Sequence, residues 1–221
     1  MKKKIQKLIH PFYKRYHFWY HRKPRKYNYG QVYTIVQPGV FSPKNTVSTK
    51  VFLDFISDLD LEHKKVLELG CGSGIMAIQA ASQKAKVWAS DINKIAVKSL
   101  NEVQKELALN INVVHSDLFD AVPEVAFDYI LINPPYYPRK PNNIEEQAWF
   151  CGAEFEFFKR LFHQISNRLE SKTKVLMILS DACDLNTIKK LAVENDLNWN
   201  EVFTKPLTFE VNSIYQLQKL K

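Results

Sequence analysis

Residues 66–74 read Val66-Leu67-Glu68-Leu69-Gly70-Cys71-Gly72-Ser73-Gly74, and the apolar residues of 75–78 then begin a helical pattern. A short apolar run that ends in three glycines at alternate positions predicts a buried strand, a tight turn and a helix N-terminus. Glycines suit such a turn because a Cβ would block the close approach of the backbone to a ligand. The free N–H groups at the start of a helix favour a polar or anionic ligand group, so this turn is a candidate binding site.

The spacing of the glycines excludes two common nucleotide-binding patterns. A dinucleotide fingerprint reads Gly-x-Gly-x-x-Gly, but the third position after Gly72 is Ile75. A P-loop continues with Gly-Lys-Ser/Thr, and no lysine follows Gly74. The run from Glu68 to Gly74 instead resembles the first motif of class I S-adenosylmethionine (SAM)-dependent methyltransferases. The resemblance implies SAM as the cofactor; a glycine turn in another kind of α/β protein is the alternative.

Length and composition indicate one globular domain with a short appendage. The chain has 221 residues, of which 46% are hydrophobic and 24% charged. No apolar run approaches the roughly 20 residues of a membrane span, and no apolar region of a secretory signal follows the N-terminal lysines. Cys71, Cys151 and Cys183 lie far apart and form no Cys-x-x-Cys pair, so neither a disulfide framework nor a metal site is expected. The cytoplasm is the expected location.

The positive charge is concentrated at the N-terminus. Residues 1–53 contain 12 Lys or Arg and no acid, whereas the rest of the chain has 19 basic and 23 acidic residues. Residues 1–29 also contain eight interleaved aromatic side chains. We therefore divide the chain into a basic aromatic arm, 1–30, and a methyltransferase domain, 31–221. Basic and aromatic side chains suit RNA binding; a helix packed on the domain is an equal alternative, and a membrane-surface helix a weaker one.

The remaining periodicity predicts an α/β fold. A strand is expected within 31–40, followed by a helix at 50–59 that Ser48 or Thr49 would cap. After the glycine turn we expect helices and strands to alternate: helices at 75–82, 93–107, 155–169 and 185–195, and strands at 86–90, 111–115, 127–132, 174–179, 199–204 and 213–219. Such alternation implies parallel strands with right-handed crossovers. Together with the resemblance, it implies a Rossmann-like, mostly parallel seven-stranded sheet flanked by helices.

Two acids are candidates for binding the cofactor. Asp91 follows the second strand, 21 positions after Gly70, where a carboxylate accepts hydrogen bonds from ribose hydroxyls. Asp117 resembles the family residue near the adenine amino group, and Leu118 would pack on the ring. Ligands of such sheets lie at the carboxyl ends of the strands, where these residues fall. The full candidate set for SAM is Glu68, Gly70, Cys71, Gly72, Gly74, Asp91, Ile92, Asp117, Leu118 and Asn133.

The fourth expected strand runs directly into Asn133-Pro134-Pro135-Tyr136. Two prolines fix φ and restrict the preceding residue, so the turn is stiff. The Asn133 side-chain oxygen and the Pro134 carbonyl could accept two N–H bonds from a planar nitrogen, while Tyr136 stacks on the planar group. No strong general base is needed, because the nitrogen becomes acidic only as it is methylated. The motif resembles the signature of methyltransferases that act on planar nitrogens; a Pro-Pro surface turn is the alternative.

The methyl acceptor is open between two macromolecular classes. Residues 146–158 resemble the segment after the catalytic turn in HemK/PrmC-type enzymes, which implies a glutamine amide of a release-factor-like protein. Only Gly152 remains of the glycines of that segment, and a basic arm stands in place of the family's N-terminal helical domain. That arm favours the second class, an exocyclic amino group of an rRNA or tRNA base such as N6 of adenine or N2 of guanine. A SAM-binding module without catalytic activity is a further alternative.

Overall fold

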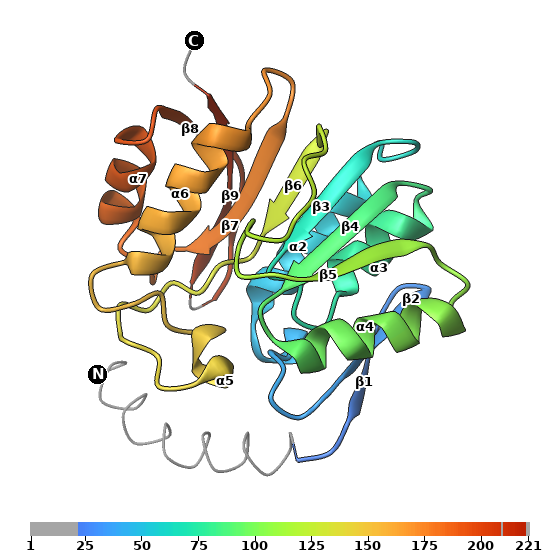
Figure 1. Ribbon diagram of the computed structural model, residues 1–221. Coiled ribbons are helices and arrows are strands. Elements are labelled where there is room, and N and C mark those ends of the chain that lie inside the picture. The colour runs from blue at the N-terminus through green and yellow to red at the C-terminus, as the bar shows by residue number, and fades with distance from the viewer. Residues whose placement is uncertain (1–21, 209, 220–221) are drawn as a thin grey trace.

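The computed structural model describes residues 22–208 and 210–219 (Figure 1). Seven strands form one sheet, in the order β5-β4-β3-β6-β7-β9-β8. Their bounds are β3 Lys65–Leu69, β4 Lys86–Asp91, β5 Ile111–His115, β6 Tyr129–Ile132, β7 Lys174–Ser180, β8 Leu197–Pro206 and β9 Val211–Lys219. The strands from β5 to β7 are parallel, and β9 pairs antiparallel with both β7 and β8. The predicted Rossmann-like fold with a mostly parallel seven-stranded sheet is confirmed.

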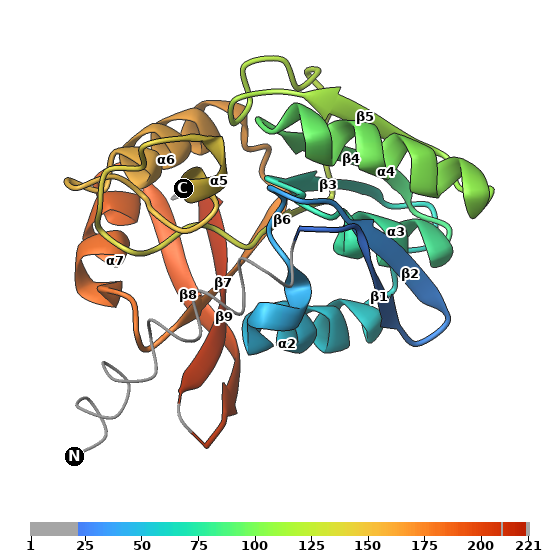
Figure 2. The same cartoon turned by 90° about the horizontal axis from the view of Figure 1, so that it is seen from below.

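Helices cover both faces of the sheet (Figure 2). One face is covered by α2 Val47–Ser57, α3 Ile75–Ser82 and α4 Lys94–Glu106, and the other by α6 Glu156–Arg168 and α7 Leu185–Val193. Along β7, Val175, Met177 and Leu179 pack towards α6 and α7, whereas Leu176 and Ile178 pack towards α2. Because successive strand residues point to opposite faces, a strand buried on both sides must be apolar throughout.

A two-stranded hairpin lies outside the main sheet. It comprises β1 Arg25–Tyr29 and β2 Val32–Val36, which pair antiparallel across Gly30. The hairpin is joined to the domain by hydrogen bonds: the Tyr29 hydroxyl donates to Asp54 at 3.0 Å, and the Ser99 hydroxyl donates to the Ile35 carbonyl at 3.0 Å. Residues 25–29, which we assigned to the basic arm, therefore pair with the first strand of the domain. Residues 1–21 of the arm lie outside the described residues.

The start of α2 differs from the prediction. The helix begins at Val47 rather than residue 50, directly after a short 3-10 turn at Pro43–Asn45. Thr46 is the N-cap residue, and no side chain caps the helix. Ser48 and Thr49 are buried within the first turn, so the prediction that one of them caps the helix is wrong. Both residues instead line the cavity described below.

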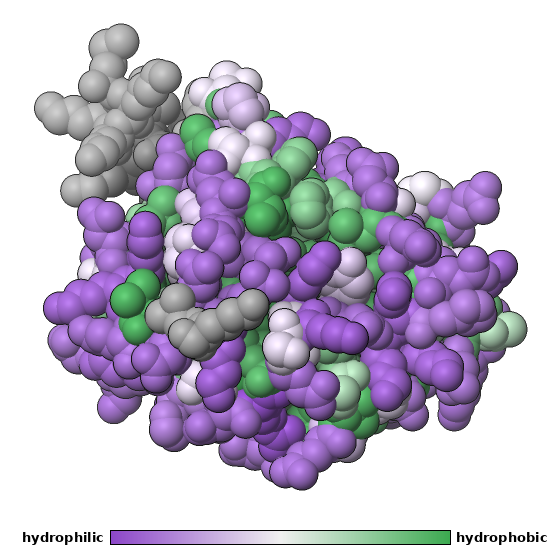
Figure 3. Space-filling view, turned by 90° about the horizontal axis from the view of Figure 1, so that it is seen from above, coloured by the Kyte–Doolittle hydropathy of each residue, from purple (hydrophilic) through white to green (hydrophobic). Residues whose placement is uncertain are grey.

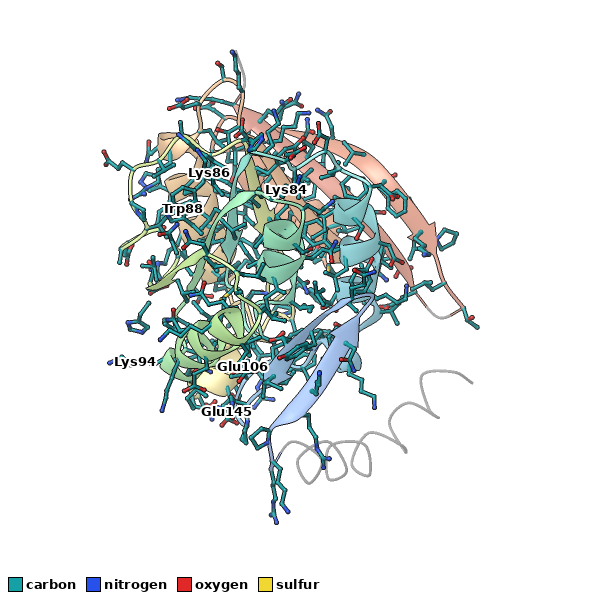
Figure 4. All side chains as sticks on the ribbon, turned by 90° about the vertical axis from the view of Figure 1, so that its right-hand side faces the viewer. Lys84, Lys86, Trp88, Lys94, Glu106 and Glu145 are labelled. Carbon is teal, nitrogen blue, oxygen red and sulfur yellow. The ribbon has the colours of Figure 1, made fainter. Side chains whose placement is uncertain are left out.

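The direction of the parallel strands decides which end of the molecule carries the site. Lys86, at the start of β4, lies at the end away from Glu145 (Figure 4). The carboxyl ends of the parallel strands therefore face the end where Glu145 and the short helix α5, Ile144–Gln147, lie. The opposite end carries mainly hydrophilic side chains with hydrophobic ones between them (Figure 3).

Candidate active site

A cavity of about 520 Å³ lies at the carboxyl ends of β3, β4 and β6. Its volume is within the range of small-molecule sites, roughly 300–1,000 Å³. The glycine turn and the Asn133-to-Tyr136 turn both line it, although Gly70 and Asn133 are 63 positions apart in the sequence. Of the candidate residues, all but Gly74 line the cavity: Glu68, Gly70, Cys71, Gly72, Asp91, Ile92, Asp117, Leu118, Asn133, Pro134, Pro135 and Tyr136.

The three glycines of the turn have different functions. All have positive φ, at 72° for Gly70, 51° for Gly72 and 74° for Gly74, a region that residues with a Cβ rarely adopt. A Cβ on Gly70 would meet nothing within 4 Å and would project into open space beside the cavity. A Cβ on Gly74 would lie 2.5 Å from Leu100 of α4. Gly74 is therefore required for close packing of α3 against α4, and not for approach to a ligand.

Two buried acids stand beside the glycine turn. Glu68 is 1% exposed and accepts a hydrogen bond from the Ala77 N–H at 2.7 Å; burial raises its pKa to about 8. Asp91 accepts hydrogen bonds from the N–H groups of Gly72 and Asn93, each at 2.7 Å. Burial raises the pKa of Asp91, and these backbone bonds partly oppose the rise. Asp91 thus fixes the turn and remains next to the cavity.

The loop after β5 brings Asp117 and Leu118 to the cavity wall. Leu118 has a φ of 48°, which is uncommon for a residue with a Cβ. The Asp117 carboxylate accepts a hydrogen bond from Arg160 of α6 at 2.9 Å. Arg160 also lines the cavity. Sequence reasoning missed Arg160 because nothing in the local pattern of a helix shows which distant loop it contacts.

Asn133 is held by a residue that the sequence analysis considered only as a helix cap. The Asn133 side-chain nitrogen donates to the Thr49 hydroxyl at 3.2 Å, and Thr49 is 3% exposed. This bond uses the nitrogen of the carboxamide and leaves its oxygen as an acceptor. Next to it, burial raises the pKa of Tyr136, whose ring lies 4.7 Å from that of Tyr137. Tyr136 is therefore neutral near neutral pH.

The segment from residue 149 to 152 lines the cavity. The Tyr137 N–H donates to the Trp149 carbonyl at 3.1 Å, and the Cys151 N–H donates to the Tyr137 carbonyl at 3.0 Å. The Trp149 ring lies 5.0 Å from that of Phe41. These two aromatic residues line the cavity and were not among the predicted site residues. They add apolar surface to the cavity.

The residues of the cavity fit SAM. Open space beside Gly70 allows close approach of a ligand, and the Glu68 and Asp91 carboxyl groups lie on the same wall. Ser90 also lines the cavity and is 1% exposed, and its buried hydroxyl has no hydrogen-bond partner, as expected beside a site for a polar ligand group. Within residues 22–208 and 210–219, no group of three or more His, Cys, Asp or Glu side chains is arranged to hold a metal. This fold and this cavity define a class I SAM-dependent methyltransferase.

The chain belongs to the family described as methyltransferase small domain, whose model matches residues 31–211. The match covers the cavity and six of the seven strands of the main sheet, ends at the first residue of β9, and excludes the basic arm, residues 1–30. The protein is thus a SAM-dependent methyltransferase. In the described part of the chain, no helix has the length and apolar character needed to cross a membrane.

Similar sequences include two groups of methyltransferases. One is a Methanocaldococcus jannaschii protein with the provisional name protein N5-glutamine methyltransferase. It is 35% identical over 161 residues, or 69% of this chain and 74% of the relative. Another is the ribosomal RNA small subunit methyltransferase C of Actinobacillus pleuropneumoniae, 37% identical over 103 residues, 45% of this chain and 31% of the relative. The match to the ribosomal RNA enzyme thus spans about a third of its length.

Solved structures share the fold. A Pyrococcus furiosus methyltransferase has a TM-score of 0.62 at 22% identity, covering 81% of this chain and 88% of its own. The T. thermophilus 16S rRNA N2 G1207 methyltransferase, in complex with AdoMet and guanosine, has a TM-score of 0.64 at 18% identity. The match covers 89% of this chain and 50% of that chain. The E. cuniculi Mtq2–Trm112 complex, responsible for methylation of the termination factor eRF1, has a TM-score of 0.62 at 19% identity. The match covers 82% of this chain and 99% of that chain.

Proposed function

We propose that this protein is an N-methyltransferase of the HemK-like kind, which methylates a planar nitrogen of a macromolecule, and that the acceptor is the side-chain amide of a protein glutamine. The observation that carries this proposal is that the Asn133 carboxamide and the glycine turn at Gly70 line one cavity. A donor bound over the glycines and an acceptor bound at the Asn-Pro-Pro-Tyr turn would meet there. Holding two reactants in this way is a large source of rate enhancement.

The cofactor residues have separate proposed roles. Gly70 and Gly72 allow the ligand to approach the backbone, Asp91 accepts from ribose hydroxyls, and Asp117 accepts from the adenine amino group. Leu118 and Ile92 pack on the adenine, and Glu68 and Cys71 form the wall beside the glycine turn. When bound, SAM supplies an electrophilic methyl group on a sulfonium. Everything else in the reaction depends on how the chain orients the acceptor.

The Asn-Pro-Pro-Tyr turn would orient the acceptor nitrogen. An amide nitrogen is a poor nucleophile because its lone pair is delocalised. The Asn133 oxygen and the Pro134 carbonyl would accept its two N–H bonds and stabilise the positive charge that develops on it. Pro135 stiffens the turn, and the Tyr136 ring would stack on the planar group. Since burial keeps Tyr136 neutral, it would act by stacking and not as a base.

Two observations favour glutamine as the acceptor. The relative that matches 69% of this chain carries the name of a protein N5-glutamine methyltransferase. The segment after the Asn-Pro-Pro-Tyr turn resembles the HemK/PrmC segment, of whose glycines only Gly152 remains, with a φ of 92°. Residues with a Cβ rarely adopt such a φ, so this position depends on glycine. The segment supports the wall beside the acceptor.

An amino group of an rRNA or tRNA base is the second candidate. It is favoured by the ten Lys or Arg and eight aromatic residues in positions 1–29, which suit phosphate contacts and base stacking. The similarity to a ribosomal RNA methyltransferase over 103 residues also supports it. Either acceptor fits a cytoplasmic enzyme, a location that the free cysteines Cys71, Cys151 and Cys183 support.

The acceptor class is tested by incubating the full-length protein with methyl-labelled SAM and a cell extract. Label that protease removes and nuclease spares would support glutamine. Label that only nuclease removes would overturn glutamine in favour of RNA. No label on any macromolecule, despite SAM binding, would favour a module without catalytic activity.

A further inference from the structure

Three polar side chains of α6, spaced four residues apart, bind the loop that follows β5. Arg160 donates to the Asp117 carboxylate at 2.9 Å, Gln164 donates to the Asp120 carboxylate at 2.9 Å, and Arg168 donates to the Val122 carbonyl at 2.9 Å. Residues at i and i+4 share one face of a helix, so the three form a row along α6. We call them the α6 row.

The α6 row also fixes the backbone of the loop. The Phe119 N–H donates to the Gln164 side-chain oxygen at 3.1 Å, and the Arg168 guanidinium lies 5.5 Å from the centre of the Phe119 ring. The loop contains Leu118 in its left-handed conformation. Such a conformation persists when surrounding contacts hold it, and the α6 row supplies several of them. The loop geometry at the cavity wall therefore depends on a helix that lies more than 40 positions further along the chain.

Arg160 occupies one side of the Asp117 carboxylate. Its guanidinium bonds to Oδ2 at 2.9 Å and lies 3.9 Å from Asp120, while both Arg160 and Asp117 line the cavity. With Oδ2 engaged, Oδ1 is the acceptor available to an N–H donor within the cavity. Because both side chains are substantially exposed, this ion pair contributes little to folding stability. Its effect is therefore on how Asp117 is oriented.

We propose that Arg160 is a positioning residue for recognition of the cofactor's adenine: it holds Asp117 so that one carboxylate oxygen accepts from the exocyclic amino group. Gln164 and Arg168 hold the loop after β5 in the position that this contact requires. The inference rests on the proposed role of Asp117 in cofactor binding. It predicts that Arg160 contributes to selectivity for adenine and hardly at all to stability.

The test compares two ligands by calorimetry, S-adenosylhomocysteine and S-inosylhomocysteine, in which a carbonyl replaces the amino group. In Arg160→Met, which removes the guanidinium and keeps an apolar stem, we expect the affinity for the adenosyl ligand to fall about two- to fivefold. The affinity for the inosyl ligand should not fall, so discrimination between the ligands decreases. Arg160→Lys should retain part of the discrimination between the two ligands. Lys159→Met, an exposed neighbour on the same helix, is the charge-matched control and should behave as wild type.

Other outcomes overturn the proposal in distinguishable ways. Equal losses for both ligands, or no loss in Arg160→Met, would eliminate Arg160 as a positioning residue. Asp117→Asn with unchanged discrimination would eliminate the role of Asp117 itself, and with it the basis of the inference. A wild-type protein that binds neither ligand would overturn the cofactor site as a whole. Hydrogen exchange gives a readout without ligand: Gln164→Leu should accelerate exchange of the Phe119 amide, and an unchanged rate would exclude the row as a support of the loop.

Discussion

The Asn133 carboxamide donates to the Thr49 hydroxyl at 3.2 Å, across 84 positions of sequence. Thr49 lies in the first turn of α2 and Asn133 lies after β6, so the bond joins two elements on the same side of the cavity. It fixes which end of the Asn133 carboxamide faces the proposed position of the methyl acceptor. The carboxamide oxygen, which our mechanism requires as an acceptor, is thereby oriented before any substrate binds.

Thr49→Val should lower kcat about tenfold, because a misoriented Asn133 loses part of its transition-state contact. The affinity for S-adenosylhomocysteine should change little, and Thr49→Ser, which keeps the hydroxyl, should restore most of the rate. Steady-state kinetics and calorimetry on the three proteins check this. If Thr49→Val and Thr49→Ser had the same kcat, a role of the Thr49 hydroxyl in orienting Asn133 would be excluded.

Asn133→Ala should reduce methyl transfer by about a hundredfold or more, the loss typical when a stabilising contact in the transition state is removed. Cofactor affinity should fall less than the rate does, since most of the proposed SAM contacts come from other residues. Single-turnover transfer with labelled SAM measures the chemical step directly. Normal transfer by this variant would refute the mechanism.

Gly74→Ala should destabilise the protein more than Gly70→Ala. Both place a Cβ at positive φ, a cost of about 1–2 kcal/mol, but only the Cβ at 74 would collide with Leu100. Overpacking adds about 1–3 kcal/mol. Gly70→Ala should instead weaken cofactor binding, because its Cβ projects beside the cavity. Chemical denaturation and calorimetry of both variants separate the two effects; equal destabilisation would contradict the packing role of Gly74.

Glu68 makes stability depend on pH. Its pKa is raised from 4.5 to about 8 by burial, so between these values the folded state holds a proton that the unfolded state releases. The contribution of Glu68 to the free energy of unfolding is therefore fully present below about pH 4.5 and is lost as the pH rises to about 8. The slope has an upper limit of about 1.4 kcal/mol per pH unit.

The matched variant for this effect is Glu68→Gln, which keeps the shape and cannot titrate. Its unfolding free energy should fall less between about pH 5 and about pH 8 than that of the wild type. Urea denaturation at both pH values gives the comparison. Parallel pH profiles for the two proteins would show that Glu68 does not titrate in this window.

Local pattern was sufficient for most of the sheet but not for all elements. The apolar runs of β3, β4, β5 and β7 are bounded by clear turn residues, and their observed bounds lie within one residue of those predicted. The strand β1 was missed because its sequence, Arg-Lys-Tyr-Asn-Tyr, has no apolar aliphatic residue and sits in a basic run. It is a strand because β2 supplies its hydrogen-bond partners.

The sequence alone determined the strand-turn-helix unit with its three glycines, the acid after the second strand and the stiff Asn-Pro-Pro-Tyr turn. These features arise from neighbouring residues, whose backbone preferences and apolar spacing act over a few positions. Only the tertiary structure decided that Thr49 orients Asn133, that Arg160 holds Asp117 from 43 positions away, and that Gly74 serves packing and not a ligand. Such contacts depend on how whole helices pack against the sheet, and local periodicity does not encode which distant side chains that packing brings together.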